Sequence, residues 1–440
     1  MQHSREYYIR VRKKKRQRNL ILCVVALFIL SVILLGLRSC TNKNGGGNKT
    51  NSEVSSSVSS TEPVDKTKTA TIGVTGDIMV HGAQLEAAKR NDGSYDFNPY
   101  FEYVKSYYNR FDCFVANLEV TFGTTTNYSG YPAFNTPVSL LDAMKNGGID
   151  TLITANNHSY DTGHKGFVNT LSMLRKYGFD FTGTRENKND NKYIIKEING
   201  IKVGMINYTY SQTNASGAVV LNNVMSAEDA ALINTFDYTK TDSFYKQAEA
   251  QLKQMREEGA DAVIIYMHWG AEYQTKQNAS QKAISQKLAD IGYDVIVGGH
   301  PHVIQPFSIL TGKDGNKTYC IYSLGNAISN QRKEILTAEA PKGHTEDGMI
   351  FGITLKKSEE GVTAVEEISI TPTWVDMFNE NGQKYYRIVP LDISVGDWKT
   401  LGAKNEAAAK ASYNRTLKCI GSEYNAYRTE KGLSTLTEIN

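Results

Sequence analysis

The sequence has little proline and cysteine, and it contains no internal repeat. Only 9 of the 440 residues are proline, and the composition as a whole excludes a collagen-like, disulfide-rich or wholly disordered chain. The 5 cysteines include no Cys-x-x-Cys pair, so neither a zinc ribbon nor a dithiol site is expected. Cys113 and Cys320 lie inside strand-like runs, where we expect buried thiols. A chain of this length suits one large catalytic core or two modest ones.

Basic charge is scarce outside the N-terminus. Residues 1–19 carry eight Lys or Arg side chains and one Glu, whereas the chain from residue 41 onward has 40 basic and 45 acidic residues. The main domain is therefore a poor candidate for general nucleic-acid binding, and no nucleic acid is expected as a partner.

One long apolar run, residues 20–37, follows this basic tail. Eighteen helical residues span roughly 27 Å, close to the hydrocarbon thickness of a bilayer, and adjacent Lys and Arg side chains stay cytoplasmic. We therefore expect a cytoplasmic tail (1–19), a single-pass anchor in the cell membrane (20–38) and an extracellular main domain. Cleavage of the run as a signal peptide and lipidation of Cys40 remain alternatives. The run is longer than a usual signal peptide core, and Arg38 stands where a lipoprotein carries a small residue.

The remaining chain divides by composition. Residues 39–69 are too poor in apolar side chains to bury a core and are predicted to be a flexible linker. From residue 70, short apolar runs alternate with helical patterns, which indicates an α/β domain with a mixed sheet over 70–400. Residues 401–440 are predicted to form a helical tail.

The secondary structure follows from apolar periodicity and from glycine stop signals. Asn199-Gly200 predicts a two-residue hairpin turn. Residues 211–241 and 329–347 are expected to be long loops near the functional site. The predicted strands are Thr71–Thr75, Cys113–Asn117, Thr151–Ala155, Phe179–Thr182, Ala262–Met267, Asp294–Val297, Tyr319–Ser323 and Met349–Leu355, and the predicted helices are Val138–Asn146, Phe167–Tyr177, Ser243–Glu258 and Gln281–Ile291.

Histidines gather just past the predicted strands. Ligands in open α/β sheets bind beyond the carboxyl ends of the strands, so six histidines at these ends indicate a site rather than scattered core residues. The six are His81, His158, His164, His268, His300 and His302. Asp77, Glu119 and Asn157 occupy similar places. Mixed oxygen and nitrogen ligands suit Mn, Fe or Zn better than Ca or Mg, and a bridging carboxylate among imidazoles is typical of a two-metal site that activates water for hydrolysis.

The order of these motifs, GD, N-x-E, NNH, HWG, G-x-H-P-H and SLGN, resembles the bacterial CapA family of capsule or poly-γ-glutamate synthesis proteins. That family is similar to the calcineurin-like metallophosphoesterases. Over about residues 70–375, the resemblance implies a layered α/β/β/α sandwich of metallophosphoesterase type, preceded here by the transmembrane helix.

The resemblance also implies roles for individual residues. Two divalent metal ions are expected on six ligands, which are Asp77, Glu119, Asn157, His268, His300 and His302. His158 is the expected catalytic residue that assists the leaving group, and Asp161 is expected to orient it. The sequence departs from the parent pattern at Met79, where a histidine ligand normally stands. One metal position is therefore expected to be weaker, or filled by His81.

Other candidates come from position alone. The expected substrate-binding residues are His81, Glu272, Tyr273 and Asn326. His164 is expected to begin a helix, and Arg185 to be solvated.

The resemblance and the ligand set together predict a metal-dependent hydrolase or transferase that acts on an anionic capsule polymer such as poly-γ-glutamate. The alternative is a non-catalytic subunit that binds or exports the polymer within a membrane synthase complex. In either case, membrane synthase or export subunits are the expected partners.

Overall fold

The computed structural model describes residues 67–336 and 343–439. The predicted anchor and most of the predicted linker lie outside the described residues. Within the two described ranges, no helix is both long and apolar enough to cross a membrane.

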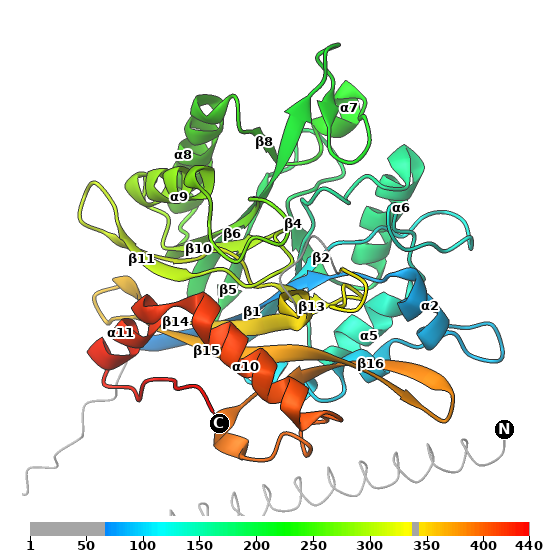
Figure 1. Ribbon diagram of the computed structural model, residues 1–440. Helices are drawn as coiled ribbons and strands as arrows, with labels where there is room; N and C mark the ends of the chain where they lie inside the picture. The colour runs from blue at the N-terminus through cyan, green and yellow to red at the C-terminus, as the bar shows by residue number, and fades with distance from the viewer. Residues whose placement is uncertain (1–66, 337–342, 440) are drawn as a thin grey trace, which may run out of the picture. The chain divides into compact units, whose positions relative to one another are not determined.

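Two mixed β-sheets form the centre of the molecule (Figure 1). The first sheet has the order β16-β15-β14-β1-β2-β3-β4, with β13 paired to β1. Its strands are β1 (Lys68–Ile78), β2 (Cys113–Leu118), β3 (Thr151–Ile153), β4 (Asp180–Thr182), β13 (Asn326–Ile328), β14 (Asp347–Lys357), β15 (Thr363–Glu380) and β16 (Gln383–Pro390). The second sheet has the order β11-β12-β10-β9-β6-β5, with β7 and β8 paired to β6. Its strands are β5 (Tyr193–Ile198), β6 (Ile201–Thr213), β7 (Val219–Val220), β8 (Thr235–Asp237), β9 (Ala262–His268), β10 (Val295–Gly299), β11 (Phe307–Thr311) and β12 (Lys317–Ile321).

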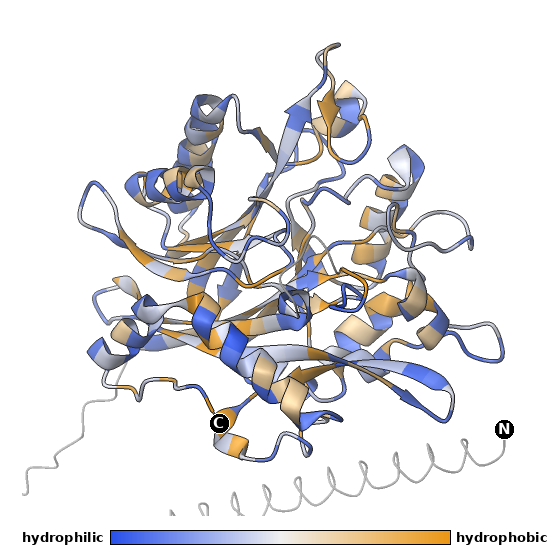
Figure 2. Ribbon diagram, viewed as in Figure 1, coloured by the Kyte–Doolittle hydropathy of each residue, from blue (hydrophilic) through white to orange (hydrophobic). Residues whose placement is uncertain are grey.

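Helices cover the outer faces of both sheets. The helices are α2 (Gly82–Ala88), α3 (Asn98–Phe101), α4 (Lys105–Tyr108), α5 (Ser139–Gly147), α6 (Gly163–Lys176), α7 (Ala227–Ala230), α8 (Thr241–Glu257), α9 (Ala279–Ile291), α10 (Glu406–Ile420) and α11 (Ser422–Glu430), with short 3-10 turns at His344–Glu346 and Ile393–Val395. One apolar cluster joins the first sheet to α2–α6, a second lies between the sheets, and a third joins the second sheet to α8 and α9. Hydrophobic residues accordingly recur along the strands and on one side of several helices (Figure 2). The predicted α/β class is confirmed.

Local signals in the sequence explain where several elements end. Gly148 and Gly292 stop α5 and α9 with φ of 98° and 108°, a left-handed conformation that favours glycine. Asn199 and Gly200 both have positive φ between β5 and β6, as the predicted hairpin requires. Cys113 and Cys320 are buried and unpaired, as expected.

Two expectations from the sequence were wrong, one about residues 211–241 and one about Arg185. Residues 211–241 are not one long loop, because β7, α7 and β8 lie within them and β8 extends the second sheet beside β6. Arg185 is not solvated: only 7% of it is exposed. Its guanidinium donates to Asn234 Oδ1 at 2.7 Å and to the Ala231 carbonyl, so backbone and amide groups replace water around the charge.

The helical tail predicted from composition is present as α10 and α11, which close one edge of the sandwich (Figure 1). Asp347, at the start of β14, is the buried polar anchor of this region. Its carboxylate accepts hydrogen bonds from Arg415 Nε and Nη2 at 2.8 and 2.6 Å, and from Ser412 Oγ at 2.7 Å. Burial raises the pKa of Asp347 to about 6 despite the Arg415 guanidinium.

Replacing Arg415 by alanine is expected to lower the free energy of unfolding by about 3–5 kcal/mol near neutral pH, because it leaves a buried charge without its partner. A carboxyl whose pKa is raised by folding stabilises the protein below its unfolded pKa and loses that contribution as pH rises through the folded value. The loss in the variant should therefore be larger at about pH 8 than at about pH 4. Urea unfolding of both proteins at the two pH values measures this difference. Lys253→Ala removes only an exposed pair with Glu257 at 3.7 Å and should cost at most about 0.5 kcal/mol. An equal, pH-independent loss in both variants would contradict the prediction.

Candidate metal centre

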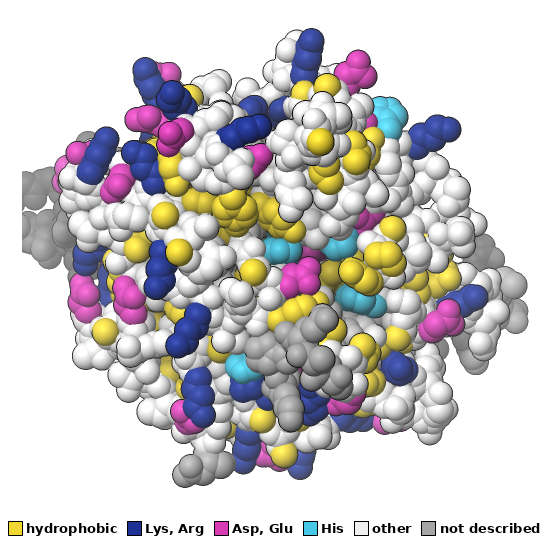
Figure 3. Space-filling model, turned by 45° about the horizontal axis from the view of Figure 1, so that its top comes forward, with side chains coloured by type: hydrophobic (Ala, Val, Ile, Leu, Met, Phe, Trp, Pro, Cys, Tyr) yellow, Lys and Arg dark blue, Asp and Glu magenta, His cyan; other side chains and the backbone are white. Residues whose placement is uncertain are grey.

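The two sheets bring their carboxyl ends to one edge, and the candidate ligands lie there. In the first sheet, Asp77 near the end of β1 pairs in register with Asn117 of β2 and Asn326 of β13. In the second sheet, His268 at the end of β9 pairs with Gly299 of β10. Histidine and acidic side chains meet in the middle of this face, beside a band of hydrophobic side chains (Figure 3). Parallel pairing of neighbouring strands therefore assembles residues that are far apart in the chain, such as Asp77 and Asn326, and Asp77 also meets His302, which is 225 positions away.

Two groups of ligand atoms share Glu119. The groups are Asp77, Glu119 and His302, and Glu119, His268 and His300, and within each group all ligand atoms lie within 4.8 Å of one another. Glu119 Oε1 lies 3.5 Å from His268 Nε2 and 3.8 Å from His302 Nε2. The carboxylate therefore faces one imidazole of each group, which is the position of a bridging ligand.

Asn157 completes the second group. Its Oδ1 lies 2.7 Å from His268 Nε2, so an amide oxygen and an imidazole nitrogen converge on one point. All six residues expected to hold metal are thus brought together at one edge of the sandwich.

Among the six candidate ligands, two buried polar atoms have no hydrogen-bond partner within the described residues. They are Glu119 Oε1 and His300 Nδ1. An unsatisfied polar atom in the interior costs about 1–3 kcal/mol, more if charged, so both atoms indicate a missing partner. A divalent cation satisfies a carboxylate oxygen and an imidazole lone pair at once, and the residues present therefore fit a bound metal.

The pKa shifts of the buried side chains at the site also favour a bound cation. Burial raises the pKa of Glu119 well above its usual range, and the neighbouring charge of Asp77 raises it further. Burial lowers the pKa of His268 and His300 well below their usual range, which keeps both imidazoles neutral and their lone pairs free for a metal. Burial alone would lower the pKa of His302, but the hydrogen bond to Asp77 at 3.2 Å, the negative charges of Asp77 and Glu272 and the hydrogen bond to Asn326 together outweigh burial and raise it. Two buried acidic groups and neutral imidazoles form an environment that favours a cation.

The backbone around the metal ligands adopts rare conformations and passes close to Asp77. His300 and His302 have φ of 93° and 56°, which is rare for residues other than glycine and is found where function demands it. A Cβ on Gly299 would lie 2.9 Å from Asp77 Oδ1, so only glycine lets β10 pass this carboxylate. Tyr273 also has positive φ, and its N–H donates to the Pro301 carbonyl between the two histidines at 2.8 Å.

His158 and Asp161 form a buried pair beside the metal ligands. His158 Nδ1 lies 2.7 Å from Asp161 Oδ2, and the Phe134 N–H donates to the same oxygen at 2.8 Å. An ionised carboxylate can only accept, so Nδ1 carries the proton and Nε2 is the nitrogen left for chemistry. The geometry fits the expected orienting contact of Asp161.

A cavity of about 300 Å³ opens at His302. We call it the His302 cleft, and it is lined by Met79, His81, Tyr131, His158, Glu272, Tyr273, His302, Asn330, Gln331, Ile335 and Leu336. The expected substrate-binding residues His81, Glu272 and Tyr273 therefore all face this cleft. Glu272 can also act as a ligand, since its carboxylate lies within 4.8 Å of ligand atoms of His300 and His302.

Two expected contacts differ in the structure. Asn326 is fully buried behind His302, where its Oδ1 lies 3.1 Å from Nδ1 of that residue, so it orients a ligand instead of lining the cleft. His81 belongs to none of the metal-capable groups among the described residues, and its ring accepts from the Asn330 N–H at 3.3 Å. Burial lowers the pKa of His81 to about 4, which leaves it a neutral wall of the cleft. His164 begins α6 as expected, with Nδ1 2.8 Å from Asp229.

Sequence reasoning missed two asparagines. Asn117 Nδ2 donates to Asp77 Oδ1 at 2.7 Å and to Glu119 Oε2 at 3.1 Å, which holds both carboxylates in place. Its position inside the N-x-E motif is a signal that could have identified it. Asn222 places its amide nitrogen 3.0 Å from His158 Nδ1, and no local pattern in the sequence indicates this contact.

Met79 lines the His302 cleft where the resemblance leads one to expect a histidine. Replacing Met79 by histidine is expected to add an imidazole to the group of Asp77 and His302, and to tighten binding of the weaker ion by about tenfold or more, or about 1.4 kcal/mol. Competition for Mn²⁺ or Zn²⁺ with a coloured chelator measures the change. Met79→Leu keeps a similar volume without adding a ligand and should leave metal affinity unchanged. Equal affinities in the two variants would contradict the prediction.

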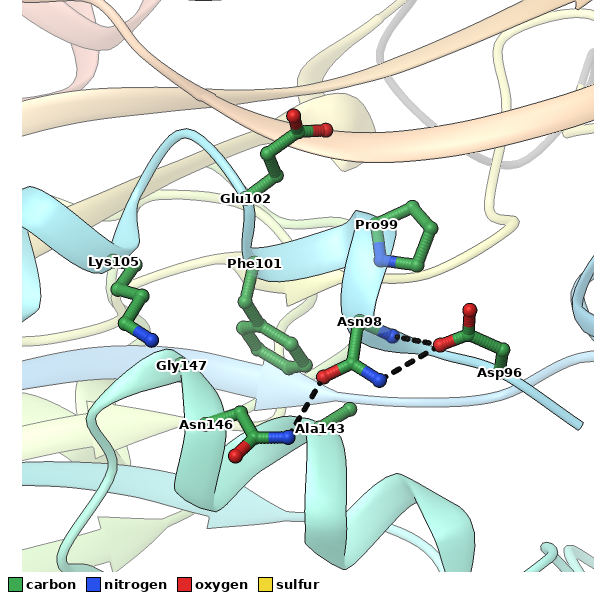
Figure 4. A pocket seen from close by; sticks show the side chains of 9 residues that line it. All are labelled: Asp96, Asn98, Pro99, Phe101, Glu102, Lys105, Ala143, Asn146 and Gly147. Atoms are coloured by element: carbon green, nitrogen blue, oxygen red, sulfur yellow. Dashed lines mark hydrogen bonds between the residues drawn. The ribbon is translucent and has the colours of Figure 1, made fainter. Parts of the chain in front are cut away.

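A separate cavity of about 370 Å³ lies between α3 and α5 (Figure 4). Three of its polar side chains bind one another, with Asn146 donating to Asn98 at 2.9 Å and Asn98 to Asp96 at 2.8 Å. It contains no imidazole or unsatisfied buried group that would indicate a reactive site.

The chain was compared with known families and proteins. The family model of the bacterial capsule synthesis protein PGA_cap matches residues 71–331. The capsule biosynthesis protein CapA of Bacillus anthracis is 30% identical over 267 residues, which cover 59% of this chain and 60% of that protein. The PGA biosynthesis protein CapA of Bacillus subtilis strain 168 is 26% identical over 303 residues, which cover 67% of this chain and 70% of that protein. The match thus spans less than two thirds of the B. anthracis protein.

Solved structures resemble the chain more distantly. The NAD nucleotidase of Haemophilus influenzae has a TM-score of 0.41 and 13% identity over 83% of this chain and 61% of its own. The sulfate thiohydrolase SoxB of Thermus thermophilus has a TM-score of 0.33 and 14% identity, covering 68% of this chain and 42% of its own. A purple acid phosphatase from yellow lupin seeds has a TM-score of 0.33 and 11% identity, covering 69% of this chain and 53% of its own.

Proposed function

Since the chain belongs to the PGA_cap family of bacterial capsule synthesis proteins, we propose that it is a metal-dependent hydrolase or transferase acting on an anionic capsule polymer. The observation that carries this proposal is the buried, unpartnered Glu119 Oε1, which faces an imidazole of each ligand group. Hydrolysis by two metal ions requires a carboxylate that can face both ions, whereas the binding of a polymer does not require a carboxylate buried among imidazoles. The name of the Bacillus subtilis relative, a PGA biosynthesis protein, favours poly-γ-glutamate or a related polymer.

Different residues of the site would hold the metal ions and transfer the proton. When bound, two divalent ions would polarise the bond under attack and activate water. Asp77, Glu119 and His302 would hold one ion, and Glu119, Asn157, His268 and His300 the other. His158 lines the cleft, and its Nδ1 contact with the Asp161 carboxylate fixes the tautomer of the ring. His158 would then donate a proton to the leaving group.

The second candidate is a non-catalytic subunit that binds nascent polymer and membrane synthase or export subunits. Met79 favours it, because a thioether is a poor ligand for a hard divalent ion at the place of the expected histidine. In both cases we propose that residues 20–37 anchor the chain, with the main domain outside the cell. Digestion of intact cells with an added protease would test this orientation, since an outside domain is cut while the basic tail is protected.

Metal content separates the two candidates. The full-length chain, purified without chelators, is expected to hold close to two equivalents of Mn, Fe or Zn, and Asn157→Ala/His268→Ala is expected to lose at least one. Removal of the metal with a chelator should abolish bond cleavage, and readdition should restore it. A folded protein that holds no metal even after reconstitution, and that supports polymer production equally well in the double variant, would overturn the hydrolase.

A further inference from the structure

A second cavity reaches the metal centre at His300. It has a volume of about 730 Å³ and is lined by residues 210–213 at the end of β6, residues 237–240 after β8, Gly270 and His300. We call it the Tyr210 cleft. Because His300 lines this cleft and His302 lines the other, with ring centroids 5.8 Å apart, the centre lies between two clefts.

Two tyrosine rings form a shelf in the Tyr210 cleft. The Tyr210 ring lies 4.8 Å from the His300 ring and 6.3 Å from the Tyr238 ring, with an angle of 30° between the two tyrosines. The Tyr238 hydroxyl accepts from the Gly270 N–H at 2.8 Å, which fixes the orientation of its ring. The shelf thus leads directly from a metal ligand and is held rigid at its far side.

The walls around the shelf carry hydroxyl and amide groups but little net charge. Lys240 is the basic residue among those lining the Tyr210 cleft, and its Nζ donates to Thr213 Oγ1 at 3.4 Å. The Asp237 carboxylate accepts from the N–H and hydroxyl of Thr239 and from the hydroxyl of Thr213 at 2.6–2.9 Å.

The His302 cleft offers no basic side chain to pair with an anionic polymer, because no Lys or Arg is among its described lining residues, which include Glu272. A polymer with a carboxylate on every unit would therefore bury several charges against walls that contain a single cation. That arrangement is costly unless each charge is paired.

A flat aromatic shelf framed by hydroxyl and amide groups fits a different kind of unit. A pyranose ring has an apolar face of C–H groups and a rim of hydroxyls, so it packs on tyrosine rings while its rim forms hydrogen bonds. We propose that the Tyr210 cleft is a carbohydrate subsite, which binds the sugar unit adjacent to the bond positioned at the metal centre. The inference rests on the proposed metal-dependent activity, but in place of poly-γ-glutamate it favours a capsule glycan whose anionic groups are sparse, one of them placed at the ions.

Binding of two short oligomers to the full-length chain tests the subsite. The probes are a neutral tetramer of N-acetylglucosamine and a γ-linked glutamate tetramer, followed by saturation-transfer NMR of their protons. We expect the sugar to bind through its ring protons, and the Kd to rise about tenfold or more in Tyr210→Ala and in Tyr238→Ala. Tyr238→Phe keeps the ring and loses only its contact with the Gly270 N–H, so it should bind the sugar more tightly than Tyr238→Ala does. Tyr245→Ala on α8, outside both clefts, should also leave the Kd unchanged.

The same measurement in His268→Ala separates this inference from the proposed function. Sugar binding should persist there, because the shelf is independent of the ions, even where metal and cleavage are lost. Absence of sugar binding to the parent, a parent-like Kd in both alanine variants, or tighter binding of the glutamate tetramer through the same tyrosines would overturn the carbohydrate subsite. None of these three results would bear on the metal content that tests the hydrolase.

Discussion

Replacing Glu119 by glutamine is expected to remove at least one metal ion and to lower activity by about a thousandfold or more, about 4 kcal/mol in the activation barrier. Glu119 is the residue shared by the Asp77–His302 and His268–His300 groups, so its loss weakens both at once. The amide keeps nearly the same shape and can still accept from Asn117, which donates to the carboxylate at 3.1 Å. Metal analysis together with kcat/KM on a cleavable polymer measures both effects.

The same variant should have the opposite effect on the metal-free protein. Burial and the neighbouring Asp77 charge raise the pKa of Glu119, so its ionised form destabilises the fold when no cation is bound. Removing that charge is expected to raise the free energy of unfolding of the metal-free protein by roughly 1–3 kcal/mol. Glu257→Gln, which alters an exposed carboxylate on α8 that pairs with Lys253, serves as the control and should leave both stability and metal content largely intact. Equal losses of stability in the metal-free and metal-loaded forms of Glu119→Gln would contradict a bridging role.

The ligand set could be predicted because it depends on regular structure. Residues at the carboxyl ends of neighbouring parallel strands meet at one edge of a sheet, so Asp77 and Asn157 could be expected together, whereas the resemblance to a known family implied that His268 joins them. The sequence also contained the stop and turn signals at Gly148, Gly292 and Asn199-Gly200, since those depend on local backbone preferences.

The contacts that the sequence did not predict join segments that are far apart in the chain. Asn222 reaches His158 from a stretch without clear periodicity, and only the packing of residues 211–241 over the site brings the two together. Arg185 looks like a solvated side chain because its partners, Asn234 and the Ala231 carbonyl, are 46 or more residues away. Asn326 shows the same limit: its place beside the site was expected, but whether it faces the cleft or His302 depends on the register of β13 against β1.

Replacing Asp161 by asparagine is expected to lower kcat by roughly 10²–10⁴-fold while leaving the metal content unchanged. Asp161 Oδ2 accepts from both His158 Nδ1 and the Phe134 N–H, and the single oxygen of an asparagine amide can still accept from both donors. The variant therefore keeps the shape of the contact but removes the negative charge that faces the imidazole during proton transfer. The loss should shrink to less than about tenfold on a nitrophenyl ester, whose leaving group needs little protonation.

Asp229→Asn is the matched control for Asp161→Asn. Asp229 contacts His164 Nδ1 at 2.8 Å, nearly the same separation as in the His158–Asp161 pair at 2.7 Å, but the His164 side chain is 64% exposed and lines neither cleft. Asp229 also accepts from the Tyr160 hydroxyl at 2.6 Å, so its variant is expected to lose some stability and to retain kcat. If the two asparagine variants lost activity in parallel, or if Asp161→Asn lost metal as well, the carboxylate would be a structural support and not the group that orients a proton donor. If Asp161→Asn keeps its metal and its loss of kcat depends on the leaving group, the result is explained only by Asp161 orienting His158 as a proton donor.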